Sequence, residues 1–449
     1  MTILESMIHY FTKGYVMSKT SPATLENIVS LCKRRGFVFP SAEIYGGVNG
    51  IYDFGHLGVL LRENIRHIWL RFLENPHGPI LRIEGALIGP AAMWKASGHL
   101  EGFHDPLVDC KVCKKRYRAD DVNLEKNCPH CGNKDWTEIR SFNMMFKTQL
   151  GAMEDASATA YLRPETAQST YVNFKNFMST YRVKLPFGIA QIGKSFRNEI
   201  TPKQFLFRMR EFEQMEMQWF CIPENAPQEL EMWLKRRLHF YMQLGIPEEK
   251  LRTYDQKPHE RAHYSSRCFD LEYEFPFGWK EVEGIAHRGN FDLTQHSEHS
   301  GKDLSVHDEA TKTSFMPHIV EAAVGVDRLF IMFLFNAYQE DIIDDEKRIV
   351  LKLHPALAPI KLAFLPLTKK QEEATHKLYL EYLSLGISVQ YDDSGSIGKR
   401  YRRQDEIGTP FCITYDFESD TDSCVTVRNR DTTQQERISL TELRKYLNL

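Results

Sequence analysis

The feature that most restricts the fold is a pair of extended segments between residues 187 and 219, joined by a polar connection at 200–206. In the second segment, positions 212, 214, 216 and 218 share one face, whereas Met215, Met217 and Trp219 share the other. This two-residue period is typical of a strand, because an α-helix would mix the two sets around its circumference. The segments therefore predict a hairpin with one polar open face.

That open face carries the side-chain types that ATP requires. Arg197 and Arg208 offer guanidinium groups that match phosphate oxygens and stabilise charge developing at phosphorus. Glu199 can accept a hydrogen bond from the adenine amino group, and the ring of Phe212 can stack on the base. The hairpin alone leaves a second interpretation open, in which this face is a solvated sheet surface with cross-strand ion pairs.

Four of the nine cysteines form two C-x-x-C pairs, Cys110/Cys113 and Cys128/Cys131. Fourteen residues separate the pairs, so four thiolates can surround one Zn²⁺ ion at about 2.3 Å. Four thiolates leave no open coordination position, which indicates a structural ion rather than a catalytic one. The alternative is four free thiols. The scattered remaining cysteines indicate reduced thiols in a cytoplasmic protein.

The net charge argues against a protein that coats nucleic acid. Lys and Arg number 57 and Asp and Glu 60, which gives −3, whereas such proteins are strongly basic. We therefore expect no DNA partner and only local contacts with RNA. No run of about 18 apolar residues predicts a membrane span. Residues 1–16 do not resemble a secretory signal.

Hydrophobic periodicity divides the chain into an α+β part up to about residue 345 and a smaller α/β part beyond it. Ser21-Pro22 predicts the start of a helix that Gly36 ends. A long amphipathic helix is expected at 57–74, where it packs on its own core or pairs with a second subunit. In the C-terminal part, we expect strands at 362–365, 411–415 and 424–427, with helices at 368–384 and 440–447.

Two further motifs resemble a known enzyme class. The run from Phe196 to Glu199, followed by Arg208-x-x-x-Phe212-x-x-x-Glu216, resembles motif 2 of class II aminoacyl-tRNA synthetases. Gly325-Val-Asp-Arg328, ahead of an apolar helix, resembles their motif 3. The predicted helix at 57–74 falls where their motif 1, the dimerisation element, is expected.

Longer matches are similar to the dimeric glycyl-tRNA synthetase family, from about residue 23 to the end of the chain. They lie at residues 34–47, 142–148, 162–168, 191–202 and 395–411. The resemblance implies a homodimer whose catalytic domain is an antiparallel sheet with flanking helices. It implies the following divisions: an N-terminal extension at 1–22, a catalytic domain at 23–345, a zinc-knuckle insertion at 105–140 and an α/β anticodon-binding domain at 355–449.

The resemblance implies a glycine–tRNA ligase that uses ATP to form glycyl-adenylate and then transfers glycine to the 3′ end of tRNA(Gly). Arg197, Glu199 and Arg328 match the catalytic residues, and Mg²⁺ is expected with ATP. The residues implied to contact ATP are Arg197, Asn198, Glu199, Phe207, Arg208, Arg210, Phe212, Glu281, Val282, Gly325, Asp327 and Arg328.

Glycine offers only an ammonium and a carboxylate for recognition. The residues implied to bind it are Arg118, Glu165, Glu213, Glu216, Glu321 and Gly325. Several carboxylates buried together are costly unless a cation compensates them, which gives a physical reason for an ammonium there. For tRNA, the best local basic cluster is Lys399, Arg400, Arg402 and Arg403, and a solvated helix start is the alternative.

The chain departs from the family pattern at several positions. Ala322-Ala323 replaces the usual Pro-Ser ahead of motif 3, so that a serine hydroxyl near the substrate is missing. Asn290, Ser169 and His56 are also unusual for the family. We expect activity because the phosphate-handling arginines are present. A catalytically silent paralogue that binds RNA or a protein, and a ligase for another small amino acid, remain the alternatives.

Overall fold

We describe the protein from a computed structural model of the 449-residue chain. The structure describes residues 23–74, 76–152, 158–262, 264–309, 312–343 and 346–447. The expected N-terminal extension at 1–22 lies outside these residues. In the described part of the chain, no helix combines the length and the apolar character needed to cross a membrane.

The described helices are α2 (Leu25–Arg35), α3 (His56–Phe72), α4 (Ala91–Ala96), α5 (His99–Gly102), α6 (Ala167–Val172), α7 (Phe174–Tyr181), α8 (Ala226–Gln243), α9 (Phe291–Ser300), α10 (Val326–Ala337), α11 (Glu372–Ser384), α12 (Ile397–Ile407), α13 (Ser419–Asp422) and α14 (Leu443–Tyr446). The strands up to β12 are β1 (Val38–Pro40), β2 (Tyr52–Phe54), β3 (Ile80–Ile83), β4 (Ile88–Pro90), β5 (His104–Asp109), β6 (Arg116–Arg118), β7 (Arg140–Asn143), β8 (Lys147–Gln149), β9 (Thr159–Leu162), β10 (Phe187–Phe196), β11 (Glu211–Cys221) and β12 (Leu251–Asp255). The later strands are β13 (Arg267–Phe275), β14 (Gly278–Gly289), β15 (Val306–Asp308), β16 (Thr313–Phe315), β17 (His318–Gly325), β18 (Tyr338–Ile343), β19 (Glu346–Leu351), β20 (Leu362–Pro366), β21 (Val389–Tyr391), β22 (Phe411–Tyr415), β23 (Cys424–Asn429) and β24 (Gln435–Ser439).

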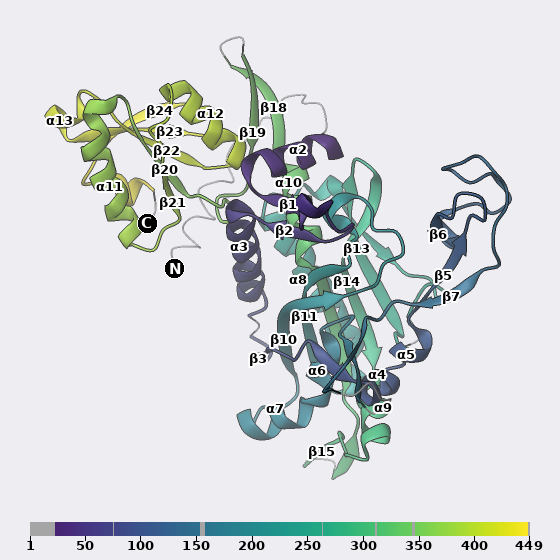
Figure 1. Cartoon of the computed structure of the whole chain (residues 1–449). Coiled ribbons are helices and arrows are strands. Elements are labelled where there is room, and N and C mark those ends of the chain that lie inside the picture. Colours follow the sequence, from purple (N-terminus) through teal and green to yellow (C-terminus); the bar gives the residue numbers. More distant parts are fainter. Residues whose placement is uncertain are drawn as a thin grey trace.

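The fold is α+β, as predicted, and its largest element is a seven-stranded sheet in the order β12-β13-β14-β17-β11-β10-β3 (Figure 1). Neighbouring strands are antiparallel except for β10 and β3. Helices α3, α8 and α10 pack against one face of the sheet. Helices α6, α7 and α9 pack against one end of the other face, which leaves the rest of that face open for a site.

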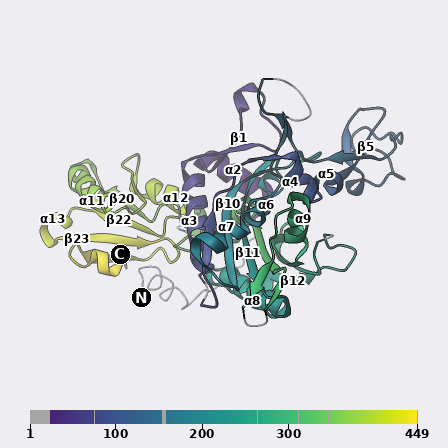
Figure 2. The same cartoon turned by 90° about the horizontal axis from the view of Figure 1, so that it is seen from below.

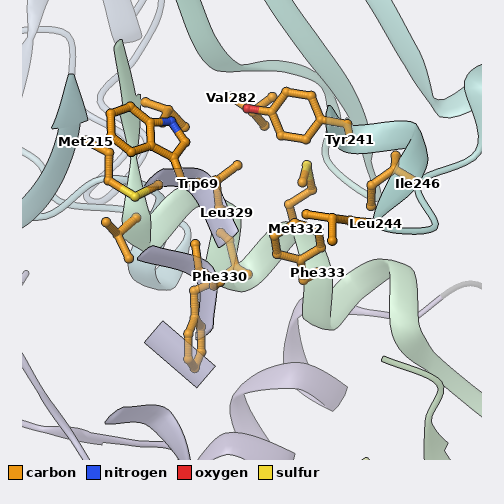
Figure 3. Packing of buried hydrophobic residues seen from close by; sticks show 14 of the residues in the cluster. Trp69, Met215, Tyr241, Leu244, Ile246, Val282, Leu329, Phe330, Met332 and Phe333 are labelled. Carbon is orange, nitrogen blue, oxygen red and sulfur yellow. The ribbon is translucent and has the colours of Figure 1, made fainter. Parts of the chain in front are cut away.

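The predicted hairpin is formed by β10 and β11, and its alternation holds along the strand. Met215, Met217 and Trp219 are fully buried in the core against α3, α8 and α10. Figure 3 shows Met215 beside Trp69 of α3 and Leu329 of α10. Because α10 is apolar on nearly every side, it can lie at the centre of this core and support the sheet from behind.

Helix α2 corrects the predicted start. It begins at Leu25 rather than after Ser21-Pro22, because the side chain of Thr24 accepts a hydrogen bond from the Asn27 amide and closes a capping box with Asn27. Its predicted end is confirmed, since Gly36 adopts the left-handed conformation with φ of 72°.

The C-terminal unit (residues 362–447) is a five-stranded sheet in the order β21-β20-β22-β23-β24. The predicted strand at 411–415 is observed with the same bounds, and those at 362–365 and 424–427 are extended by one and two residues. The sequence prediction missed the short strand β21 and the edge strand β24. In both views, this unit and the β5–β7 segment lie at opposite ends of the molecule (Figures 1 and 2).

The connection into the C-terminal unit is held by two side chains. Lys361 Nζ donates to the carbonyl oxygens of Pro355 and Ala356, each at 2.8 Å, and burial lowers the pKa of Lys361 to about 7. Asn64 of α3 donates to the carbonyl oxygens of Leu357 and Ala358. The connecting segment is therefore fixed to both parts of the protein.

A buried charge cluster fixes α12 against the β18–β19 hairpin. Asp405 is fully buried and accepts two hydrogen bonds from Arg428, at 2.8 and 3.0 Å, and one from Arg348 at 3.3 Å. Arg348 also pairs with Asp341. Removal of one partner from such a cluster leaves uncompensated buried charge.

Asp405→Ala should therefore destabilise the protein by about 3–5 kcal/mol, because Arg348 and Arg428 would lose their shared counter-ion. Denaturant unfolding of the two proteins measures this difference. Asp393→Asn, at an exposed carboxylate of the same unit, serves as the control and should cost nothing measurable. An equal and small effect of both variants would contradict the assignment.

Candidate active site

A cavity opens on the face of the sheet that α3, α8 and α10 leave uncovered. Its floor is formed by β11, β13, β14 and β17, and its wall includes Gln256, Glu260, Ala262, Tyr264 and Ser265. Most of the predicted site residues line it: Glu165, Arg197, Glu199, Phe207, Arg208, Phe212, Glu216, Glu281, Val282, Glu321, Gly325, Asp327 and Arg328. The alternative interpretation of the hairpin, a solvated sheet surface with ion pairs, is therefore wrong, because its polar face lines a cavity.

Two arginines reach this cavity from different elements, Arg197 from the end of β10 and Arg328 from α10. Arg197 Nε donates to the Pro164 carbonyl at 3.1 Å, and its guanidinium lies 5.3 Å from the centre of the Phe212 ring. Arg328, at the start of α10, pairs with Glu281 at 3.2 Å and lies over the Phe207 ring. Each guanidinium is thus held beside an aromatic ring, with donor groups left to face a phosphate.

Glu199 lines the same cavity as these arginines. It is buried, and its Oε2 lies 3.5 Å from Arg208 Nε. Among the described residues, this oxygen accepts no hydrogen bond. Burial raises the pKa of Glu199, whereas Arg208 and Arg197 oppose that rise. A ligand amino group would satisfy the unpaired oxygen, since buried polar atoms are normally hydrogen-bonded.

Three glutamates from three different elements also line this cavity. Glu165 precedes α6, Glu216 lies on β11 and Glu321 lies on β17. Glu165 receives a hydrogen bond from Gln168 at 2.9 Å and lies 3.3 Å from His99 Nε2. Glu321 receives one from Gln218 at 2.7 Å. The cluster is acidic enough to hold a small cation.

The three carboxyl groups do not ionise alike. Burial, together with the charges of Glu321 and Glu165, raises the pKa of Glu216 to about 8. Burial acts on Glu165 in the same direction, but His99, Arg288 and Gln168 outweigh it and hold the pKa of Glu165 below its usual value. The ligand-free pocket therefore keeps a proton on Glu216 at neutral pH. The positive charge of a bound ammonium group could replace that proton.

Sequence reasoning did not assign a role to Arg288, which lines the cavity beside the glutamates. Its guanidinium donates two hydrogen bonds to Asp292, at 2.8 and 3.0 Å, and it donates to both carboxylate oxygens of Glu321, at 3.1 and 3.2 Å. The Tyr264 ring lies 3.7 Å from it. Asn290, which lies between Arg288 and Asp292, was the only residue of this segment named from the sequence. Their spacing gave no signal of the contact with Glu321, which comes from the pairing of β14 with β17.

The family departures lie in different surroundings. Ala323 lines the cavity opposite Glu216 on β11, whereas Ala322 faces the core and is fully buried. Ser169 Oγ donates to the Thr166 carbonyl and accepts from Gln191, so the unusual serine is fully used. His56 is an exposed first residue of α3.

The structure does not bring Glu213 to the cavity, contrary to the prediction. On β11 it alternates with Phe212 and Gln214, so its side chain lies on the opposite face. There it pairs with Arg62 at 2.9 Å and Arg66 at 2.7 Å. Its backbone amide donates to Asp327 at 2.8 Å, and this hydrogen bond joins motif 2 to motif 3.

Three other predicted residues also lie outside the cavity lining. Arg118 pairs with the buried Asp105 at 3.2 Å, beside the cavity rather than within it. The Arg210 side chain binds backbone groups rather than facing the cavity, since it donates to the carbonyl oxygens of Glu199 and Asn49. The backbone amide of Asn198 donates to the Met144 carbonyl.

The basic cluster on α12 is corrected in part. Arg400 is buried and donates to three carbonyl oxygens, those of Pro366, Asp393 and Gly395. Arg403 is paired with Asp392 at 2.8 Å. Lys399 is exposed, and Arg402 is half-buried beside Ile343. Periodicity could not separate them, because a buried arginine can satisfy its donors with backbone carbonyls.

The four cysteines of the insertion come together as predicted. Their sulfur atoms all lie within 4.8 Å of one another, with Cys110 and Cys131 at 3.6 Å and Cys113 and Cys128 at 3.8 Å. Tetrahedral ligands at about 2.3 Å from Zn²⁺ stand about 3.8 Å apart. The donor set and its spacing therefore fit a structural zinc ion.

Comparison with known families agrees with this arrangement. Residues 146–337 match the family described as tRNA synthetase class II core domain (G, H, P, S and T), and residues 361–448 match the family described as anticodon binding domain. The fold and the site are therefore those of a class II aminoacyl-tRNA synthetase, which confirms the resemblance of motifs 2 and 3.

Curated relatives narrow this class further. A glycine–tRNA ligase of Caldanaerobacter subterraneus subsp. tengcongensis is 48% identical over 94% of this chain and 98% of its own length. Those of Alkaliphilus oremlandii and Borreliella afzelii are each 49% identical, over 95% and 94% of this chain and 98% and 96% of their own lengths. The chain belongs to the glycine–tRNA ligase family.

The raised pKa of Glu216 predicts a pH-dependent gain in stability for Glu216→Gln. The folded state keeps a proton that the unfolded chain releases above its usual pKa of 4.5, so wild-type stability falls as pH rises toward about 8. Thermal melts of the ligand-free proteins should show a gain for Glu216→Gln that grows between about pH 5 and about pH 8.5.

Glu211→Gln provides the matched control for this measurement. Glu211 begins the same strand, but it is half-exposed and pairs with Lys194 at 2.8 Å. Its substitution should not produce a gain that grows with pH. A pH-independent difference between Glu216→Gln and the wild type would contradict the assignment of the buried proton.

Proposed function

We propose that this chain is a working glycine–tRNA ligase that activates glycine with ATP and transfers it to the 3′ end of tRNA(Gly). The observation that carries the proposal is a single cavity lined both by the carboxylate cluster of Glu165, Glu216 and Glu321 and by Arg197 and Arg328. This arrangement suits an ammonium beside a polyphosphate. It disfavours a silent paralogue, because a protein without turnover has no need of either feature.

The proposed first step joins the glycine carboxylate to the α-phosphate of ATP. A glycine carboxylate oxygen forms a bond to the α-phosphorus of ATP, and the bond from that phosphorus to the bridging oxygen breaks, so that pyrophosphate leaves. Arg197 would hold the α-phosphate and Arg328 the γ-phosphate end, so both would stabilise developing charge. Glu199 would accept from the adenine amino group, and Phe212 would stack on the base.

In the proposed second step, a terminal ribose hydroxyl of the tRNA attacks the glycyl carbonyl and AMP leaves. Mg²⁺ would enter with ATP, and Glu281 is positioned to approach it because it lines the cavity beside Arg328. The metal would neutralise phosphate charge when bound. The chain's own groups orient the reactants, which is the larger part of such catalysis.

The remaining assignments are proposals of the same kind. We keep the division into a catalytic domain at 23–345 and an anticodon-binding domain at 355–449, and we place the protein in the cytoplasm as a homodimer. The dimer is supported by an exposed apolar turn at the end of β1, where Ile44 and Tyr45 are 88% and 87% exposed.

The test is exchange of labelled pyrophosphate into ATP, with glycine, alanine and serine measured side by side. We expect exchange with glycine alone. Arg197→Ala or Arg328→Ala should lower its rate on the order of 10²–10³-fold, because each removes a donor to the transition state. Arg444→Ala, which breaks an exposed ion pair with Glu381, is the control and should leave exchange unchanged.

The outcomes separate the alternatives. Absence of exchange with all three amino acids would exclude the ligase. A preference for alanine or serine would instead indicate a class II ligase for another small amino acid, with Ala323 as the first residue to examine.

The zinc proposal has its own measurement. Purified protein should contain about one zinc ion per chain, and Cys110→Ser should lose most of it, because three thiolates leave the tetrahedral site incomplete. Elemental analysis measures the metal content, and a melting curve reports the loss of the insertion's stability. Cys424→Ser, in the C-terminal unit, should keep its zinc, and a zinc-free parent would refute the site.

A further inference from the structure

A joint between the two parts of the protein lies where α12 meets α2. Glu406, the neighbour of the buried Asp405, forms ion pairs with both Arg34 and Arg35 of α2. The side chains of Glu406, Arg35 and Arg34 are 14%, 23% and 42% exposed, so the carboxylate of Glu406 is shielded from solvent whereas Arg34 lies at the exposed edge of the joint. These three residues therefore link the C-terminal unit to the N-terminal helix across 371 positions of sequence.

The joint connects to the cavity through a short path of backbone contacts. Helix α2 leads through Gly36 into β1 and then into the turn that ends at Gly50. The carbonyl oxygen of Gly50 accepts from the Arg210 amide at 2.9 Å, and the Arg210 side chain donates to the Glu199 carbonyl at 3.1 Å. Helix α2 is thus connected, through Gly50 and Arg210, to the backbone of Glu199 in the cavity wall.

The rate of tRNA charging depends more on where the 3′ end of the RNA lies than on how tightly the RNA binds. An RNA held by the C-terminal unit must present its 3′ end at the cavity, and a small misplacement of a reacting group lowers a rate steeply. Asp405 holds α12 to the β18–β19 hairpin, and Lys361 and Asn64 hold the connecting segment. Glu406 adds a further attachment on the side of α12 that faces α2, so it restricts the orientation of the C-terminal unit more than those contacts do alone.

We propose that Glu406 is a positioning residue for tRNA charging, because its ion pairs with Arg34 and Arg35 set the orientation of the C-terminal unit relative to the cavity. The proposal rests on the proposed function in that it assumes an RNA bound by the C-terminal unit. Glu406 does not line the cavity in which ATP and glycine are proposed to bind. Its loss should therefore affect the transfer step and spare glycine activation.

The experiment compares Glu406→Gln with the wild type in two reactions and in solution scattering. We expect kcat for tRNA charging to fall about tenfold with KM for tRNA changed less than about twofold, because the RNA contacts remain while the 3′ end is misplaced. Glycine-dependent pyrophosphate exchange should stay within about twofold of the wild type. Small-angle X-ray scattering of the variant should show a larger maximum dimension.

Two further variants guard the interpretation. The double variant R34Q/R35Q removes the same joint from the other side and should reproduce both the loss of charging and the change in scattering. Glu381→Gln is the matched control, since Glu381 is paired with Arg444 within the C-terminal unit and bridges nothing. It should behave as the wild type does.

The results distinguish failure of this inference from failure of the proposed function. Unchanged charging and scattering in Glu406→Gln would overturn the inference, and so would an equal fall in charging and exchange. A wild-type protein that fails to charge tRNA would refute the proposed function. In that case, scattering decides the inference, which stands only if both joint variants open the molecule and Glu381→Gln does not.

Discussion

A buried charge cluster behind the sheet is the contact on which the rest of the site depends. Glu213 of β11 is paired with Arg62 of α3, and Asp327 at the start of α10 lies 3.4 Å from the same arginine. Charges taken out of water are tolerated only when each has its partner, so the three elements must be in place together. Because Phe212 and Arg328 are chain neighbours of this cluster, their placement at the cavity is fixed from the rear.

On the cavity face of the same strand, the polar groups are less completely paired. Glu216, on the cavity face of β11, has a side-chain oxygen that accepts no hydrogen bond among the described residues. The protein thus pairs the charged groups behind β11 with one another and leaves a buried carboxyl oxygen in front of it without a hydrogen-bond donor. Functional sites commonly retain such local instability, which the surrounding structure must support. The core around Trp69 and Leu329 supplies that support here (Figure 3).

Sequence reasoning recovered the elements whose patterns are local. Alternation along β11, the paired cysteines and the glycine that ends α2 each have a physical cause within a few residues, and each was predicted. Arg400 and Glu213 were misplaced for a different reason. The partners of Glu213 lie on α3, distant in sequence, and the Arg400 side chain donates to backbone carbonyls, which leave no sequence signature. A charged residue that satisfies the protein itself therefore has the same sequence signature as one that binds a ligand. The alternation on β11 did contain the information to exclude Glu213 from the open face.

The clamped connection between the two parts has a consequence for how this protein can be rebuilt. Linkers between domains are usually exposed and tolerate insertion, but residues 355–358 give four backbone carbonyls to Lys361 and Asn64. The boundary is therefore a packed part of the structure rather than a flexible linker. A chimaera that exchanges the C-terminal unit with that of a relative must keep residues 355–358 together with Lys361 and Asn64, since a cut in this segment would divide a shared piece of core.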